Sequence, residues 1–173
     1  MRVIKNNLIA VFALLVLAVS AAAAPPRSAS QDDKVRKELV TLPYYGVFDN
    51  LEYQVNGDTV TLSGQVLRPS TRSDAARRVS RIEGVDHVIN NIEVLPPSQF
   101  DDSIRVRAYR AIFRTGGLYR YAMGTNPSIH IIVKNGHVTL EGVVSNRMDS
   151  QLAYMAANGL PGVFSVTNNL RVQ

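Results

Sequence analysis

The chain has 173 residues, enough for one medium domain or two small ones, and 46% of them are hydrophobic, which argues against wholesale disorder. It contains no cysteine, so disulfides, thiolate metal sites and a cysteine nucleophile are excluded. The formal net charge is +5 and falls to +3 (17 basic and 14 acidic residues) without Arg2 and Lys5, which is too balanced to indicate nucleic acid as a partner.

The first residues have the pattern of a secretory signal peptide. Arg2 and Lys5 precede an apolar segment at residues 8–19, and four alanines follow at residues 21–24. Because Pro25 is unfavourable directly after a cleavage site, we predict a signal peptide over residues 1–23, a disordered leader over residues 24–31 and a periplasmic location. The alternative is an uncleaved anchor, for which the apolar segment is short, since a span needs about 20 residues.

Three sequence motifs occur twice, always 78 positions apart. The pairs are VTLSG at 60–64 with VTLEG at 138–142, GV at 84–85 with GV at 162–163, and NNIEV at 90–94 with NNLRV at 168–172. A constant offset indicates an internal duplication. We therefore predict a first domain over residues 32–95, a linker over residues 96–100 and a second domain over residues 101–173.

Each copy is expected to begin with an amphipathic helix whose first residues are acidic, which suits a helix N-terminus. Apolar residues share one helical face at Val35, Leu39 and Leu42, and in the second copy at Ile104, Ala108 and Ala111. The second copy has nine additional residues after this helix, around residues 116–127. We expect this glycine-containing insertion to be a flexible loop.

A hairpin with alternating apolar residues follows in each copy. Gly57-Asp58 and Asn135-Gly136 are expected to form its two-residue turns, since Asn-Gly accepts positive φ at both positions. Gly64 and Gly142, near the end of the hairpin, indicate a bulge or the close approach of a helix.

A second helix and a final strand complete each copy. The core face of the helix is formed by Ala75, Val79 and Ile82, and in the second copy by Ala153, Ala157 and Leu160. Gly84 and Gly162 should end these helices, and the last strands cover residues 88–94 and 166–172. The predicted fold class is α+β, with two tandem αββαβ domains, each a three-stranded mixed sheet with two helices packed on one face.

In the order of its motifs the chain resembles the BON domain, named for bacterial osmotic-stress and nodulation proteins. The hairpin with VTLSG, the Gly84-Val85 helix end and the strand with Asn90-Asn91 carry the resemblance, and all recur in the second copy. It covers residues 32–173 and implies a dual-BON exported protein acting at the cell envelope. Phospholipid binding is the activity most often attached to the family, and some dual-domain relatives act in osmotic stress or as periplasmic chaperones. The resemblance supplies no catalytic residue set.

Residue types that carry chemistry are sparse. Of the three histidines, His130 is expected to face Glu141 across the hairpin as a solvated pair, on the sheet face away from the helices. No three ligands converge on a metal site, and no nucleophile motif or phosphate-binding glycine loop is present. We therefore predict no catalytic residues, no metal and no cofactor, and expect the protein not to be an enzyme.

Charge is distributed unequally between the copies. Residues 32–96 hold eight basic and ten acidic residues, whereas residues 97–173 hold eight basic and four acidic residues. Basic and aromatic side chains beside each other suit an anionic lipid surface, and a solvated helix face is the plainer interpretation. The candidate residues here are Arg107, Arg110 and Arg114, which share one helical face, with Tyr119, Arg120 and Tyr121.

The second helix of the second copy has a second apolar stripe of Met148, Leu152 and Met155, about 120° from its core face. The aligned positions in the first copy, Ser70, Asp74 and Arg77, are polar. Because this stripe does not face the core of its own domain, we expect it to contact lipid, a partner protein or the first domain. We favour a non-enzymatic envelope protein that binds anionic phospholipid peripherally through the second domain, in envelope integrity or osmotic stress. The alternative function is that of a periplasmic chaperone or protein–protein adaptor. In that case its partners would be envelope proteins.

Overall fold

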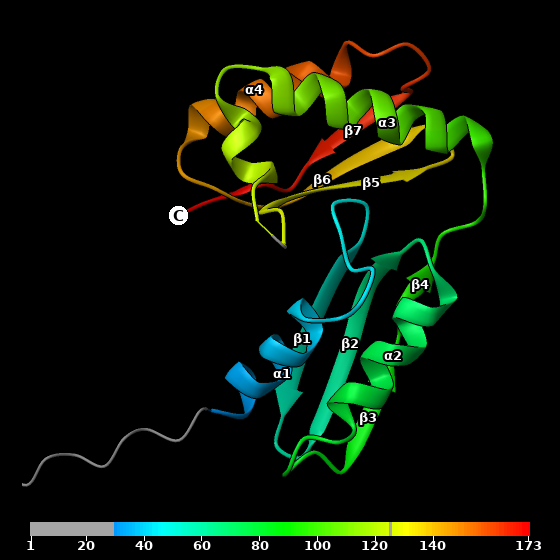
Figure 1. Ribbon diagram of the computed structural model, residues 1–173, viewed down its shortest axis with the longest axis vertical. Coiled ribbons are helices and arrows are strands. Elements are labelled where there is room, and N and C mark those ends of the chain that lie inside the picture. Colours follow the sequence, from blue (N-terminus) through cyan, green and yellow to red (C-terminus); the bar gives the residue numbers. More distant parts are fainter. Residues whose placement is uncertain (1–29, 125) are drawn as a thin grey trace, which may run out of the picture.

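The computed structural model describes residues 30–124 and 126–173, which form two domains of similar architecture (Figure 1). The predicted signal peptide, its cleavage site and nearly all of the predicted leader lie outside the described residues. Among the described helices, none is long and apolar enough to cross a bilayer.

Both domains follow the order helix, strand, strand, helix, strand. The first domain consists of α1 (Gln31–Val40), β1 (Asn50–Asn56), β2 (Thr59–Val66), α2 (Pro69–Val79), β3 (His87–Asn90) and β4 (Glu93–Val94). The second consists of α3 (Gln99–Arg114), the 3₁₀ helix η1 (Leu118–Ala122), β5 (Ile129–Lys134), β6 (His137–Val144), α4 (Arg147–Asn158), β7 (Ser165–Asn168) and β8 (Arg171–Val172). The predicted duplication and αββαβ order are confirmed.

Each sheet is mixed, as predicted. In the first domain β1 pairs antiparallel with β2, and β3 and β4 run parallel to β2. The second domain repeats this arrangement with β5, β6, β7 and β8. The expected turns are present: Asn56 pairs with Thr59 and Lys134 with His137, and Asn135 has a φ of 53°.

The last strand of each domain is interrupted by the repeated Asn-Asn pair. Asn90 Nδ2 donates to Arg72 O in α2 at 3.1 Å, and its Oδ1 accepts from the N–H of Ile92 at 3.2 Å. Asn168 makes the equivalent bonds to Ser150 O and from Leu170 N. The asparagine therefore turns the chain locally and fastens the last strand to the second helix, which explains why the motif occurs in both copies.

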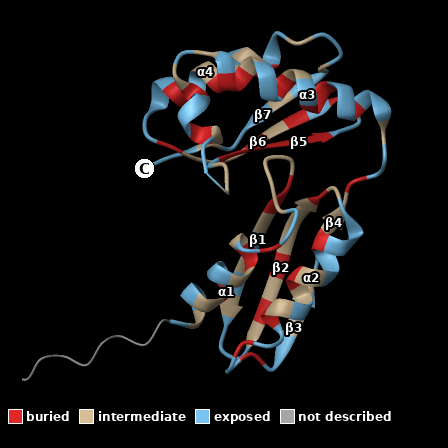
Figure 2. Ribbon diagram, viewed as in Figure 1, coloured by how far each residue is buried: buried red, intermediate tan, exposed pale blue. Residues whose placement is uncertain are grey.

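The two helices of each domain cover one face of its sheet, and the core lies between them (Figures 1 and 2). Of the residues predicted for the second-helix core, all but Leu160 are buried, and Leu160 is partly buried and packs against the core. In the first helix of the second copy Ile104 and Ala108 are buried, but Ile112 rather than Ala111 is the third buried position.

Gly64 and Gly142 lie within their strands, and backbone at or directly before the start of the partner strand, rather than a helix, approaches them closely. Their φ angles are 104° and 115°. A Cβ at Gly142 would lie 2.1 Å from Ser128 O, and one at Gly64 would lie 2.1 Å from Asn50 O.

Gly84 and Gly162 also have positive φ, but α2 and α4 have already ended at Val79 and Asn158, so neither glycine is the residue that ends its helix.

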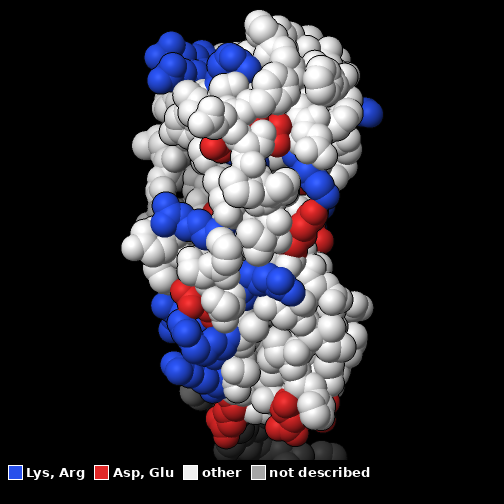
Figure 3. All heavy atoms as spheres, turned by 90° about the vertical axis from the view of Figure 1, so that its right-hand side faces the viewer, with Lys and Arg blue, Asp and Glu red and all other residues white. Residues whose placement is uncertain are grey.

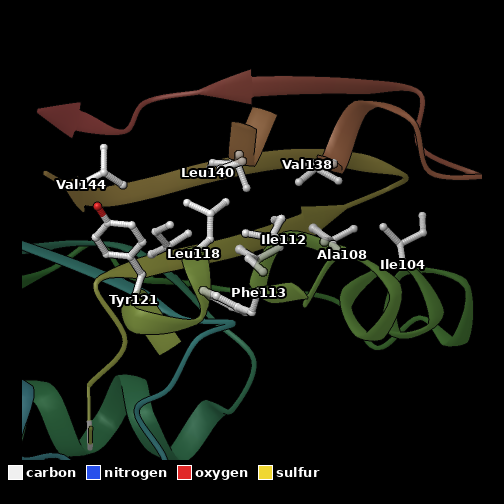
Figure 4. Packing of buried hydrophobic residues seen from close by; sticks show 14 residues of the cluster. Ile104, Ala108, Ile112, Phe113, Leu118, Tyr121, Val138, Leu140 and Val144 are labelled. Atoms are coloured by element: carbon white, nitrogen blue, oxygen red, sulfur yellow. The ribbon is translucent and has the colours of Figure 1, made fainter. Parts of the chain in front are cut away.

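The first part of the insertion forms the 3₁₀ helix η1 and adds Leu118 and Tyr121 to the core of the second domain, which corrects the expectation of a flexible loop there. Gly116 and Gly117 adopt positive φ and turn the chain into η1. Leu118 is fully buried and Tyr121 is 6% exposed; both point from η1 toward β6 in Figure 4. Leu118 and Tyr121 therefore fill space in the core next to α3 and the sheet of the second domain.

The first domain contacts the second along β5, the edge strand of the second sheet. The N–H of Ile131 donates to Val47 O at 2.7 Å, so residues 46–48 lie along the edge as a short added segment. Lys134 and Glu93 form an ion pair at 2.6 Å at one end of this contact, and Asn126 Nδ2 donates to Val40 O at 2.7 Å at the other.

Side chains of the first domain extend the interface over both sides of β5. Phe48 packs edge-on against Tyr109 of α3, with ring centroids 6.3 Å apart. His130 is 8% exposed and its Nδ1 lies 3.1 Å from Gly46 O, so the expectation of a solvated His130–Glu141 pair is wrong. The register that places them opposite each other is confirmed, but Glu141 accepts a hydrogen bond from Asn169 instead.

Candidate functional site

The candidate residues of the second domain lie on the outer side of its helical layer, where α3 and α4 pack against each other. The helices run antiparallel: Leu152 of α4 is next to Gly116, at the end of α3, whereas Arg107 of α3 is next to Gly162, beyond the end of α4. We call the exposed surface along this contact the α3–α4 face. It is defined by Arg107, Arg110, Arg114, Met148, Leu152 and Met155.

The three arginines reach this face because of helical periodicity. Ile104, Ala108 and Ile112 point into the core, which places Arg110 and Arg114 on the solvent side of α3 that adjoins α4. Arg107 is half-buried and donates to Ser103 Oγ at 3.1 Å. Over residues 30–124 and 126–173, none of the three guanidinium groups forms an ion pair with a carboxylate.

The apolar stripe of α4 divides into exposed and packed residues. Met148 and Met155 are 64% and 51% exposed, whereas Leu152 is half-buried and packs against the domain core. Since the interdomain contact is made by β5 and residues 46–48, the first domain does not cover the two methionines. Uncovered methionine side chains beside unpaired arginines can bind an apolar and anionic surface.

Lys and Arg side chains lie near the upper end of the second domain in Figure 3, and another group of them lies on the first domain in the lower half of the view. Arg105 is not among the available cations, because it is 2% exposed, pairs with Asp102 at 2.6 Å and donates to Val133 O. It fixes the end of β5 to α3 and has a structural role. The sequence pattern did not indicate that Arg105 would be buried and paired while the neighbouring arginines of α3 would not.

Two predicted site residues in η1 belong to a hydrogen-bond network inside the domain. The Tyr121 hydroxyl donates to Asp149 Oδ2 at 2.5 Å and accepts from the N–H of Ser145 at 2.9 Å. Arg120 pairs with the same carboxylate. The hydrogen bond from Tyr121, together with Arg120, holds the pKa of Asp149 below its ordinary value.

The prediction that Tyr121 binds lipid or a partner is therefore wrong for this conformation, because its ring is buried. Arg120 remains partly exposed, with its charge offset by Asp149. Tyr119 is 62% exposed, so it is the aromatic residue of η1 that is available to a partner.

We expect Tyr121→Phe to lower the free energy of unfolding by about 2 kcal/mol, since it removes the buried hydrogen bond from the Tyr121 hydroxyl to Asp149, as well as the bond from the Ser145 N–H. Urea denaturation followed by circular dichroism measures the change. Tyr119→Phe is the matched control and should change stability by less than about 0.5 kcal/mol. Equal effects of the two substitutions would contradict the structural role of Tyr121.

Two aromatic residues that sequence analysis did not single out are also exposed. Phe100 at the start of α3 and Phe164 after α4 lie with ring centroids 6.1 Å apart, and Phe164 is 70% exposed. No group of three or more candidate metal ligands occurs among the described residues. The arrangement offers unpaired cations and apolar side chains for binding.

The fold defines a tandem α+β protein with two domains of the same architecture. The family model of the BON domain matches residues 29–96 and 101–173, so the chain belongs to the BON domain family. Members of this family are generally non-catalytic, and membership supports a role at the cell envelope. No curated protein matches the chain.

Among solved structures, the chain is similar to CdsD of Chlamydia trachomatis. One structure is of the C-terminal domain of CdsD, described as the structural protein of the Type III secretion system. It matches at 10% identity with a TM-score of 0.34, over 86% of this chain and all of that chain. A second CdsD structure matches with the same identity and TM-score, over 81% of this chain and 90% of that chain.

Proposed function

We propose that the protein is exported to the periplasm and binds anionic phospholipid peripherally through the α3–α4 face. The observation that carries this proposal is that three arginines, which form no ion pair among the described residues, share the α3–α4 face with two exposed methionines that the first domain leaves uncovered. The first domain contacts the second through β5, away from this face. It has no second apolar stripe on α2.

The arginines supply long-range attraction. Each basic residue near an anionic membrane surface contributes about 1 kcal/mol, so three give weak and reversible binding. Their attraction decays over a Debye length of about 10 Å at 0.1 M salt, so binding should weaken as salt is added. Since Arg105 and Arg120 are already paired with carboxylates, we assign this attraction to Arg107, Arg110 and Arg114.

The methionines supply the apolar part of the contact. Met148 and Met155 can enter the headgroup layer without disturbing the core, because Ala153 and Ala157 form the buried side of α4. Tyr119 is exposed on η1 next to Arg120, which pairs with Asp149 near the start of α4, and an exposed tyrosine suits the membrane–water boundary. Leu152, on the same side of α4, is half-buried and packs against the domain core.

Vesicle flotation tests the proposal directly. The protein should float with vesicles that contain phosphatidylglycerol and remain unbound with vesicles of phosphatidylcholine alone. Raising the salt concentration should release it. Equal flotation with both lipids, or no flotation with either, would contradict lipid binding through this face.

We expect Met148→Ser together with Met155→Ser to weaken binding by about tenfold or more at every salt concentration, since each lost apolar contact is worth about 1 kcal/mol. The fold should be unchanged, because both side chains are exposed. Ile89→Ser, at an exposed apolar residue of the first domain, is the control and should bind like the parent. Loss of client-protein protection without any lipid binding would instead favour a chaperone or adaptor.

A further inference from the structure

His130 lies in the contact between the two domains. It is on β5, whose edge is covered by residues 46–48, and its Nδ1 lies 3.1 Å from Gly46 O. The His130 ring also packs against Tyr45, with ring centroids 5.4 Å apart. The next residue, Ile131, donates its N–H to Val47 O. The imidazole and the edge hydrogen bond therefore belong to one contact.

The titratable groups around His130 have partners of their own. Asp49 is 4% exposed, and its carboxylate accepts from the N–H of Gly46 at 3.1 Å and of Leu67 at 2.7 Å. Glu141, opposite on β6, accepts from Asn169 at 2.6 Å. Glu52 of β1, with Arg36 of α1 and Arg171 of β8, lines the same interdomain groove. Across the described part of the chain, His130 forms no ion pair with a carboxylate.

We propose that His130 makes the docking of the first domain onto β5 sensitive to pH, with the neutral imidazole closing the contact and the protonated imidazole opening it. A neutral ring with its proton on Nδ1 donates to Gly46 O and leaves no second N–H. Protonation adds a charge to a ring that is largely buried and that, among the described residues, forms no ion pair with a carboxylate. The hydrogen bond to Gly46 O and the charge of Asp49 favour the protonated form, but the loss of hydration on burial outweighs both, so protonation favours the undocked state, in which water reaches the ring.

The direction of the effect follows from linkage. Burial lowers the pKa of His130 below its ordinary value of 6.5, with the nearby Asp49 acting in the opposite sense. The docked state therefore binds fewer protons, so docking is favoured above that ordinary value and weakens as the pH falls below it. Burial raises the pKa of Asp49 from 3.8, which favours docking as Asp49 becomes protonated in the more acidic range. The His130 effect is thus expected from about pH 6.5 downward.

Amide hydrogen exchange in the full mature protein measures docking at Ile131. Between about pH 7.5 and pH 5.5, its protection factor should fall, by at most about tenfold, because pH 5.5 lies about one unit below the ordinary pKa of histidine. The N–H groups of Asn91 and Asn169, which bond to Leu62 O and Leu140 O inside the two domains, should keep their protection. The proposal would be overturned if the protection factor of the Ile131 amide did not change with pH, or if all three amides lost protection equally.

Two further measurements isolate the imidazole. His130→Asn keeps an N–H donor but cannot titrate, so its Ile131 protection should be independent of pH, whereas His137→Asn on the exposed side of the hairpin should behave like the parent. Retention of the parent's pH dependence in His130→Asn would overturn the proposal. In the parent, the NMR titration of the His130 ring should have a midpoint below 6.5, and a midpoint at or above this value would also overturn it.

Discussion

Reversing the charges of Arg107, Arg110 and Arg114 to glutamate should weaken binding to phosphatidylglycerol vesicles by at least about 100-fold at low salt, because each lost cation removes about 1 kcal/mol and each new carboxylate adds repulsion. The difference from the parent should shrink at about 1 M salt, where the Debye length is about 3 Å. Vesicle flotation over a series of salt concentrations measures both effects.

The matched control reverses three exposed basic residues of the first domain, Lys37, Arg72 and Arg81, none of which forms an ion pair among the described residues. It changes the net charge by the same amount as the α3–α4 variant. Only the latter should lose binding. If both variants lost binding equally, net charge rather than this face would govern the interaction. If both stayed folded and bound like the parent, the proposed lipid site would be wrong.

Replacing Gly142 by alanine should have the largest effect on stability of any substitution considered, with a loss of about 4 kcal/mol or more. The new Cβ would lie 2.1 Å from Ser128 O, and the φ of 115° is one that side-chain-bearing residues rarely adopt. The neighbour is the backbone of Ser128, the residue directly before β5, whose carbonyl accepts from the N–H of Val143 in β6, so it cannot move aside without disturbing the start of the β5–β6 pair. Thermal unfolding followed by circular dichroism measures the loss.

Gly64→Ala should act in the same way on the first domain, since its Cβ would meet Asn50 O at 2.1 Å. Gly159→Ala provides the control: its Cβ would meet Met155 O at 3.7 Å, an ordinary contact, so stability should change by less than about 0.5 kcal/mol. A mild effect at Gly142, similar to that at Gly159, would show that the strand pair tolerates the displacement.

Sequence alone predicted the duplication, the hairpin turns and most of the helix faces. These features depend on local periodicity and on turn residues such as Asn135-Gly136, whose backbone preferences act within a few positions. The hairpin register followed from the turn, so the placement of His130 opposite Glu141 was also predictable. The split of each last strand was not, because it depends on a bond from Asn90 or Asn168 to a helix distant in sequence.

The prediction of the candidate site was less complete. Helical spacing correctly grouped Arg107, Arg110 and Arg114, and the exposed Met148 and Met155, on one layer of the domain. It could not separate these from Tyr121, which is buried by the insertion. A tyrosine next to an arginine looks the same in sequence whether its hydroxyl meets water or a carboxylate such as that of Asp149.

The sequence by itself therefore determined the type and order of the elements, because these follow from interactions between residues close along the chain. Only the tertiary structure decided which polar groups are free, since Arg105 and Tyr121 find their partners on other elements of the same domain. It also decided that residues 46–48 cover β5 and enclose His130. An exposed strand edge accepts any backbone that reaches it, so its partner depends on the relative placement of the two domains rather than on a local pattern.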